Sequence, residues 1–142
     1  MWGFRGCFSV IRNTALAWVV DTALMAIARL SLVVLDCPDP WSLAPFYERL
    51  TGMKKTQEGA TYVVIGHSLD DGIGFQKVEN YRRPRWPDPV FPQQSHLDLE
   101  VDDLAAAHDQ VLAIGATLLH DGAPRFQVFA DPVGHPFCLC AS

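Results

Sequence analysis

Apolar positions along residues 30–78 follow first a strand pattern and then a helix pattern. An apolar run ends at the proline-rich turn 36–40, which predicts a buried strand over 30–35. The next apolar residues recur at helical spacing between Asp39, which can cap a helix, and Gly52, which can end one. Three more strands are expected after this helix, at 53–57, 61–65 and 73–78.

The same order recurs in the second half of the chain. Residues 95–101 alternate between polar and apolar positions, as in a strand with one buried face. Asp102 or Asp103 can cap a helix that runs to about Ile114, and Gly115 can end it. The remaining strands are expected at 117–119, 126–130 and 137–140.

The repeated order predicts an α+β fold of two βαβββ modules around one core, at 29–78 and 94–140. A linker at 79–93 joins them, and four prolines within 81–92 exclude a central strand there. Trp86 in this linker is either an apolar lid over a pocket, beside an arginine for an anionic group, or part of a solvated loop. The solvated loop is the simpler interpretation, because long loops lie on protein surfaces.

Residues 1–28 precede the first predicted strand. They resemble a signal peptide in having basic residues before the apolar run 15–20, but Asp21 interrupts that run. A loosely attached helix, or translation from an upstream start with Met25 as the natural beginning, explains the same residues. We therefore predict a non-native or loosely attached extension, and expect the chain to fold without residues 1–24.

Length and charge limit the kinds of partner. A chain of 142 residues is the size of one domain and can fold without a metal or a disulfide. Its 11 basic and 16 acidic residues give a net charge of −5, which disfavours nucleic acid and membrane surfaces as partners. The four cysteines lack the density of a disulfide scaffold and the paired spacing of a zinc site. We therefore expect reduced thiols in a cytoplasmic protein.

The polar face of the strand 95–101 carries the main candidate for chemistry. A two-residue period places His96, Asp98 and Glu100 on one face and apolar residues on the other. Imidazole titrates close to neutral pH, so His96 is suited to be a metal ligand or a general base if this face lines a concavity. The alternative is a surface histidine on a half-exposed sheet, which predicts the same alternation.

Cys138 and Cys140 share one face of the last predicted strand. Together with His96 or His135 they suggest a zinc site, but the usual second pair of ligands at defined spacing is missing. Buried cysteines acting as small apolar residues are the simpler interpretation. The turn 131–134 before this strand is interpreted as setting shape rather than taking part in chemistry. The sequence contains no phosphate-binding loop, serine-hydrolase elbow or zincin motif.

Several stretches together resemble a known family. They are Val33-Val34-Leu35-Asp36-Cys37-Pro38-Asp39-Pro40, Phe46-Tyr47, Leu50-Thr51-Gly52, His96-Leu97-Asp98-Leu99, Val101-Asp102-Asp103-Leu104 and Ala130-Asp131-Pro132-Val133-Gly134-His135-Pro136-Phe137. The set is similar to a glyoxalase-like domain of the vicinal oxygen chelate superfamily over residues 29–140. The bleomycin-resistance and extradiol dioxygenase branches are more distantly similar. The resemblance implies that the two modules form a curved, cup-like mixed sheet.

Metal-dependent members of this superfamily hold a divalent ion through side chains on the first and last strands of each module. The matching positions here are Leu32, Gln76, His96 and Cys138. Leu32 cannot ligate a metal, Gln76 offers a neutral amide oxygen, and Cys138 stands where a carboxylate is expected. Because Mg²⁺ and Mn²⁺ prefer several oxygen ligands, we expect a degenerate site with no metal and no other cofactor. A softer divalent metal held by His96 and Cys138 stays open.

The resemblance therefore implies a glyoxalase-like domain that binds a small organic molecule in the cup. Its expected contacts are Gln76, Trp86, His96, Asp98 and Cys138, with His96 as polar anchor or catalytic base and Asp98 as its charge partner. One alternative is a metal-dependent lyase or dioxygenase that uses His96, and another is an antibiotic-sequestering protein of the resistance type. Many related domains place the pocket near a dimer contact, so a homodimer is also expected.

Overall fold

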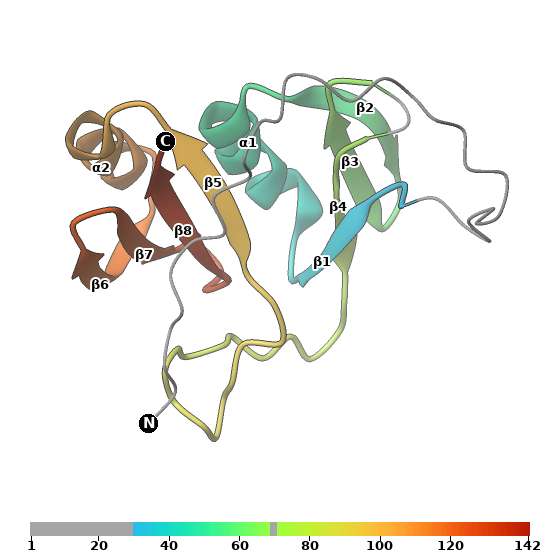
Figure 1. Ribbon diagram of the computed structural model, residues 1–142. Coiled ribbons are helices and arrows are strands. Elements are labelled where there is room, and N and C mark those ends of the chain that lie inside the picture. Colours follow the sequence, from blue (N-terminus) through green and yellow to red (C-terminus); the bar gives the residue numbers. More distant parts are fainter. Residues whose placement is uncertain (1–29, 69–70) are drawn as a thin grey trace, which may run out of the picture.

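The computed structural model describes residues 30–68 and 71–142 (Figure 1). The first module contains β1 (Val33–Cys37), α1 (Pro40–Thr51), β2 (Lys54–Gly59), β3 (Tyr62–Gly66) and β4 (Ile73–Lys77). The second contains β5 (Leu97–Val101), α2 (Leu104–Ala113), β6 (Thr117–Ala123), β7 (Phe126–Ala130) and β8 (Pro136–Ala141). The predicted order of strand, helix and three strands, repeated twice, is confirmed. The predictions for residues 1–28 lie outside the described residues.

Each module forms a four-stranded mixed sheet. The strand order is β1-β4-β3-β2 in the first sheet and β5-β8-β7-β6 in the second. In both, the first strand runs parallel to the last strand of its module, and the other neighbours are antiparallel. The register places Asp36 opposite Gln76 in the first sheet and Asp98 opposite Cys138 in the second. Two open, curved βαβββ sheets, visible side by side in Figure 1, confirm the α+β fold class.

Local signals set the ends of both helices. Oδ1 of Asp39 accepts a hydrogen bond from the N–H of Trp41 at 3.1 Å and so caps α1. Gly52 ends α1 with a φ of 76°, a left-handed conformation that a residue with a Cβ adopts only with strain. Of the two predicted caps of α2, Asp103 rather than Asp102 is the one that accepts a backbone N–H.

The sixth strand extends beyond the predicted segment 117–119. β6 continues to Ala123, and its pairing with β7 shifts register on both sides of His120. Such bulges interrupt the alternation of apolar and polar side chains along a strand. The polar pair His120 and Asp121 therefore lacks the sequence pattern of a strand although it lies in one.

One apolar core joins the two modules, as predicted. The ring of Phe46 on α1 lies 6.0 Å from the ring of Phe137 on β8. Phe137 in turn stacks on Phe129 of β7 with 5.7 Å between ring centroids. All three rings are buried. Because large aromatic side chains contribute strongly to apolar burial, this stack holds the first helix against the second sheet.

Strand β5 shows the predicted alternation. Leu97, Leu99 and Val101 pack against the core. Asp98 and Glu100, the residues between them, are exposed. The polar face proposed from the sequence is therefore present, and it lies on the side of the second sheet that faces away from the helices.

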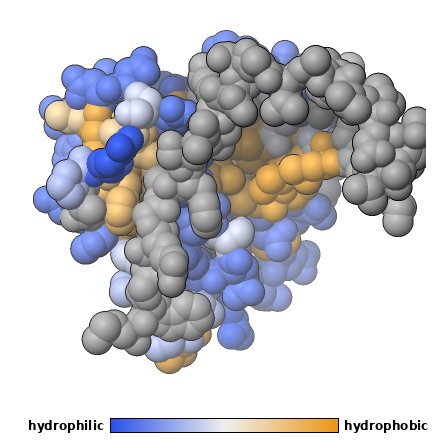
Figure 2. Space-filling view, viewed as in Figure 1, coloured by the Kyte–Doolittle hydropathy of each residue, from blue (hydrophilic) through white to orange (hydrophobic). Residues whose placement is uncertain are grey.

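Two adjacent valines of the edge strand β1, whose side chains point to opposite faces of the sheet, are partly uncovered. Val33 and Val34 are 38% and 52% exposed. Figure 2 shows the apolar patch that lies over this strand. An exposed apolar patch on a strand at the edge of a sheet is typical of a surface that meets another molecule.

Cys37 and Cys138 are buried free thiols, as predicted. Cys140 is disulfide-bonded, so the prediction of reduced thiols is wrong for this residue. The spacing of cysteines along the sequence argued against a zinc site, but it does not show whether a given cysteine forms a disulfide.

Within the described part of the chain, no helix is long and apolar enough to cross a membrane.

Candidate functional site

A cleft of about 510 Å³ opens where the two modules and the linker meet. Its walls come from β1, from both ends of the linker 79–93 and from the turn that precedes β8. Apolar side chains such as Val34 and Leu97 line it together with His96 and His135. Most of the other lining residues are polar or charged. A concave site of this volume is large enough for a small organic molecule.

His96 lies in the wall of this cleft and also belongs to a group of three polar side chains. Its Nε2 atom is 3.4 Å from Oδ1 of Asp98, and the two side chains are 32% and 31% exposed. The thiol of Cys138 completes the group, whose nitrogen, oxygen and sulfur atoms all lie within 4.8 Å of one another. The fold therefore brings together three of the residues predicted for the site.

Asp98 and Cys138 meet because they are partners in the parallel β5–β8 pair. Burial raises the pKa of the Cys138 thiol to about 12, and the charge of Asp98 and a hydrogen bond to its carboxylate act in the same direction. The thiol is therefore protonated at neutral pH, and it is a hydrogen-bond donor rather than a nucleophile. A metal ion bound here would have to displace that proton.

Trp86 lies against the same face of the second sheet. It packs on a small buried cluster of Val128, Cys138 and Cys140. Its ring centroid is 6.1 Å from that of His120 on β6. The side chain is thus partly buried, in contrast to a fully solvated loop, and it borders the group that contains Cys138. Its role as a lid over a ligand stays a prediction.

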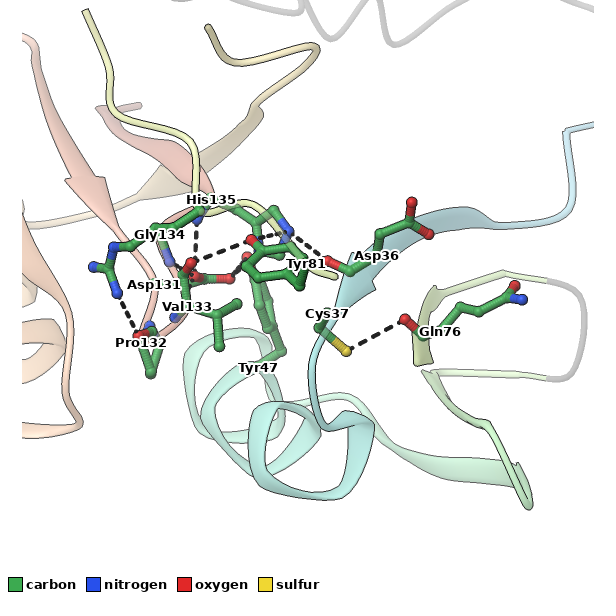
Figure 3. A network of polar contacts seen from close by, with 11 residues as sticks. Asp36, Cys37, Tyr47, Gln76, Tyr81, Asp131, Pro132, Val133, Gly134 and His135 are labelled. Carbon is green, nitrogen blue, oxygen red and sulfur yellow. Dashed lines mark hydrogen bonds and ion pairs between the residues drawn. The ribbon is translucent and has the colours of Figure 1, made fainter. Parts of the chain in front are cut away.

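Gln76 lies apart from these residues. It is exposed on β4 of the first sheet, opposite Asp36. Its backbone carbonyl accepts a hydrogen bond from the Cys37 thiol at 3.6 Å. Figure 3 shows its side chain directed away from His135. Of the predicted contacts, His96 alone lines the cleft, so the contacts of Gln76, Trp86, Asp98 and Cys138 with a ligand stay predictions.

A network that was not predicted from the sequence supports one wall of the cleft (Figure 3). Its centre is Asp131, which is fully buried. Oδ1 of Asp131 accepts hydrogen bonds from the N–H groups of Val133, Gly134 and His135 at 2.9, 2.7 and 2.9 Å. Oδ2 accepts from the Tyr47 hydroxyl at 3.0 Å and lies 2.6 Å from Nδ1 of His135. The carboxylate therefore connects the β7–β8 turn with helix α1.

The outer nitrogen of His135 extends this network to the first strand and the linker. Nε2 donates to the carbonyl oxygen of Asp36 at 2.9 Å and lies 3.1 Å from the Tyr81 hydroxyl. That hydroxyl donates to the carbonyl oxygen of Val133 at 3.1 Å. His135, Asp36 and Tyr81 all line the cleft. The wall is therefore a hydrogen-bonded assembly of three chain segments.

The two phenols of the network stay protonated. Burial raises the pKa of Tyr47 well above its ordinary value, and the charge of Asp131 and the hydrogen bond to it add to this effect. Burial also raises the pKa of Tyr81, again with a contribution from Asp131. A phenol that keeps its proton keeps its role as donor, so both tyrosines hold their acceptors over the neutral pH range.

A local signal for this network exists in the sequence. An aspartate that opens a turn can accept from the backbone two to four residues on, and Asp131 and His135 have that spacing. Tyr47, the partner of Asp131, is 84 residues away from it along the chain. Asp36, the partner of His135, is 99 residues away. Patterns within a short stretch of sequence do not reveal contacts between residues so far apart along the chain. The interpretation of 131–134 as setting shape therefore missed how the turn builds the cleft wall.

Residues 32–140 match the family described as a glyoxalase-like domain. The match spans most of the chain, so the protein belongs to this family, within the vicinal oxygen chelate superfamily, as the resemblance implied. No curated protein matches the chain.

Solved structures share the fold. A glyoxalase/bleomycin resistance protein/dioxygenase family enzyme from Burkholderia phytofirmans PsJN is 18% identical with a TM-score of 0.64, over 80% of this chain and 98% of that one. The fosfomycin resistance protein FosX from Listeria monocytogenes is 14% identical with a TM-score of 0.64, over 82% and 95%. TnmS3, an antibiotic binding protein from Streptomyces sp. CB03234, is 21% identical with a TM-score of 0.57, over 83% and 98%. Likeness at these identities shows the fold alone.

Proposed function

We propose that this glyoxalase-like domain binds a small organic molecule in the cleft, with His96 as its polar anchor or base. The observation that carries the proposal is the position of His96, in the cleft wall and 3.4 Å from Asp98. An imidazole beside a carboxylate can accept or donate a hydrogen bond to a ligand at neutral pH. Asp98 is its proposed charge partner.

Cys138 and Trp86 extend the proposed site along the second sheet. Cys138 presents a neutral thiol next to Asp98. Trp86 packs against the cluster that includes Cys138 and offers an apolar surface. Indole rings supply large contact area with one polar edge, which suits a lid over an organic ligand. Gln76 contributes to this site only if the first sheet also takes part in binding.

The proposal is tested with His96→Ala in a thermal-shift screen of a fragment library. We expect fragments that stabilise the wild-type chain to lose that effect in the variant, while the melting temperature without ligand stays nearly the same. His67→Ala removes another exposed histidine, outside the cleft lining, and is the matched control. A large loss of stability in His96→Ala with unchanged fragment binding would show a structural histidine and contradict the proposal.

The group of His96, Asp98 and Cys138 supports a second candidate, a metal-dependent lyase or dioxygenase. It offers one nitrogen, one carboxylate oxygen and one sulfur within 4.8 Å of one another. This donor set fits Zn²⁺ better than Mg²⁺, which prefers oxygen ligands. A bound ion would supply a Lewis acid for a carbonyl or enolate oxygen of the substrate.

Metal content per chain decides on this second candidate. The protein is purified without a His-tag, incubated with Zn²⁺ alone and analysed by plasma mass spectrometry beside His96→Ala. Near-stoichiometric zinc that is lost in the variant supports the lyase and directs substrate screening to α-hydroxythiols, because zinc has no redox chemistry with which to serve a dioxygenase. Zinc-free protein after this incubation excludes the zinc form and leaves the binding protein.

Antibiotic sequestration is the form of the binding function that one of the similar structures suggests, and a second is described as a resistance protein. TnmS3 is described as an antibiotic binding protein and FosX as a fosfomycin resistance protein. A sequestering protein needs no catalytic residue, so the cleft suffices for it. Drug binding without turnover in a mass-spectrometric assay separates this function from that of an enzyme.

We also propose that the chain is a homodimer in the cytoplasm, a location that the free thiols of Cys37 and Cys138 favour and the disulfide of Cys140 opposes. The partly exposed Val33 on the edge strand β1 supports a second copy as the partner, because an exposed apolar residue on a sheet edge favours pairing with another chain. Light scattering at micromolar concentration tests the assembly, and a monomer contradicts it. Cell fractionation tests the location.

A further inference from the structure

A row of four side chains crosses the face of the second sheet that lies away from the helices. Asp98 on β5, Cys138 on β8, Val128 on β7 and His120 on β6 are partners from strand to strand. Residues directly opposite each other on neighbouring strands point to the same face. The two ends of the row are polar and exposed, whereas Cys138 and Val128 in its middle are each 1% exposed. Something therefore covers the middle of the row.

The linker places one aromatic ring over this row. The two middle residues form, together with Cys140, a buried apolar floor that is separate from the core under the helices. Leu119 and Phe126, which also pack on this floor, belong to the sheet itself. Of the partly buried apolar residues packed there within the described chain, Trp86 is the one that the linker supplies. Its ring centroid lies 6.1 Å from that of His120 at the end of the row. The second sheet therefore has a place for an aromatic ring, and the chain fills it with its own indole.

The segment that carries Trp86 holds its shape through contacts of its own. The N–H of Arg85 donates to the carbonyl oxygen of Phe91 at 2.8 Å, and the N–H of Asp88 donates to the carbonyl oxygen of Arg85. The Arg85 guanidinium also lies 4.8 Å from the centroid of the Phe91 ring, a cation–π contact that joins the two ends of the segment. Residues 85–91 can therefore move as a unit and keep their shape when they leave the sheet.

The part of the linker that builds the cleft wall is anchored independently of this segment. Nη1 of Arg83 donates to the carbonyl oxygen of Pro132 at 2.9 Å. The Tyr81 hydroxyl donates to the carbonyl oxygen of Val133 at 3.1 Å. Both anchors precede residue 84 and end on the turn before β8. Release of Trp86 from the sheet therefore leaves the cleft wall in place.

The floor under Trp86 adjoins the polar atoms of the candidate site. The Cys138 thiol lies within 4.8 Å of the ring nitrogen of His96 and the carboxylate of Asp98, and His96 also lines the cleft. A ring that replaces the indole has the same apolar floor below it and His96 beside it. Burial of aromatic surface on this floor stabilises either occupant. Because the indole and a ligand ring need the same floor, each excludes the other.

We propose that Trp86 is an autoinhibitory plug: it fills a subsite for a planar aromatic group, and a ligand with such a group displaces it together with residues 85–91. This inference rests on the proposed binding function and adds the regulation of the site and the chemical class of one part of the ligand. The lid proposed above is then the displaced position of the same segment. Since only chains whose plug has left can bind, the apparent affinity is the intrinsic affinity reduced by their fraction.

Indole, the ring of the plug itself, is the probe. It is titrated to millimolar concentration into the full-length ¹⁵N-labelled wild type, Trp86→Phe and Trp86→Ala, and the backbone amides of Cys138 and His96 report binding by NMR. We expect the affinity for indole to rise in this order, by about tenfold or more from the wild type to Trp86→Ala, with shifts at Cys138. Trp86→Phe leaves a smaller ring on the floor, so it decides the order if the alanine variant does not fold.

Trp41 provides the matched controls, since its side chain is 41% exposed on α1. Trp41→Phe and Trp41→Ala should bind indole within about twofold of the wild type. Displacement has its own readout in the wild type, because nuclear Overhauser contacts between the Trp86 ring and the floor should disappear when indole saturates the protein. Contacts between indole and the floor should replace them.

The outcomes distinguish this inference from the proposed function. Equal affinity of the wild type and the folded Trp86 variants for indole overturns the plug, and so does saturation of the wild type while Trp86 keeps its contacts with the floor. Neither result bears on His96, whose role is tested by the fragment screen. Conversely, adding His96→Ala to Trp86→Ala should change the affinity for indole less than about twofold. Loss of the anchor role of His96 in that screen therefore leaves the plug standing.

Discussion

The carboxylate of Asp131 and the imidazole of His135 form a pair 2.6 Å apart that joins the β7–β8 turn to both modules. The pair is largely hidden from water, with side-chain exposures of 0% for Asp131 and 16% for His135. A charge removed from water persists only where hydrogen bonds and a partner replace the solvent. Three backbone N–H groups and the Tyr47 hydroxyl do so here. Stability and the shape of the cleft wall therefore depend on the same carboxylate.

Asp131→Asn should destabilise the protein by about 3 kcal/mol. The amide of asparagine has no negative charge, and its NH₂ group would face N–H and O–H groups that are themselves hydrogen-bond donors. Urea unfolding at neutral pH measures the change. Asp109→Asn, at an exposed position of α2, is the matched control and should stay within about 0.5 kcal/mol of the wild type. Equal stabilities of the two variants would contradict a structural role of the Asp131 charge.

Tyr47→Phe should cost about 1 to 2 kcal/mol. It removes the donor that reaches Asp131 at 3.0 Å from α1 and keeps the buried ring. Tyr62→Phe removes the hydroxyl of a tyrosine that is 40% exposed, and it should change the unfolding free energy by less than about 0.5 kcal/mol. If both variants unfold at the same urea concentration, the hydroxyl of Tyr47 contributes nothing to the junction of the modules.

Short-range signals accounted for most of the fold. Asp39 and Gly52 act on neighbouring backbone groups, so the sequence around α1 suffices to predict where the helix begins and ends. The alternation over 96–101 depends on the two-residue period of a strand, which needs no knowledge of its neighbours. Strand β6 was predicted too short because its bulges at His120 depend on the pairing with β7.

The candidate site was predictable only in part for the same reason. His96 directly precedes β5 and Asp98 lies on it, so their common side follows from the two-residue period of an extended chain. Cys138 lies beside them because it is the partner of Asp98 in the β5–β8 pair. The family resemblance implied that His96 and Cys138 share a site, whereas no local sequence pattern does. The contacts of Tyr47 with Asp131 and of Trp86 with the second sheet arise from how the modules and the linker pack.

Gly134→Ala should destabilise the protein more than Gly52→Ala. Both residues have a positive φ, 103° and 76°, so alanine is strained at each. A Cβ at Gly134 would also meet the side chain of Arg83, whereas one at Gly52 would meet nothing within 4 Å. We expect losses of about 2 to 3 kcal/mol and about 1 kcal/mol. Differential scanning calorimetry of the two variants measures both.

Arg83 makes this prediction specific, since its Nη1 atom donates to the carbonyl oxygen of Pro132 at 2.9 Å and holds the side chain over the turn. Combining Arg83→Ala with Gly134→Ala should therefore recover part of the loss, as expected for neighbouring residues whose effects do not add. Additive losses in the double variant would mean that only the φ angle matters at Gly134.

The Cys37 thiol should make the protein less stable in alkaline solution. Its pKa rises from 9.0 to about 11, chiefly because the side chain is buried on β1, with smaller contributions from nearby carboxylates. Between these two values the unfolded chain loses the thiol proton and the folded chain keeps it, so the free energy of unfolding falls as the pH rises. The full effect is about 3 kcal/mol, present below pH 9.0 and lost by about pH 11. Urea unfolding of the wild type and of Cys37→Ala from about pH 7 to about pH 10.5 isolates it, because Tyr47 and Tyr81 titrate in both proteins and their contributions cancel. The wild type should lose stability more steeply than the variant above about pH 9, and parallel curves would show that the unfolded and folded thiols titrate alike.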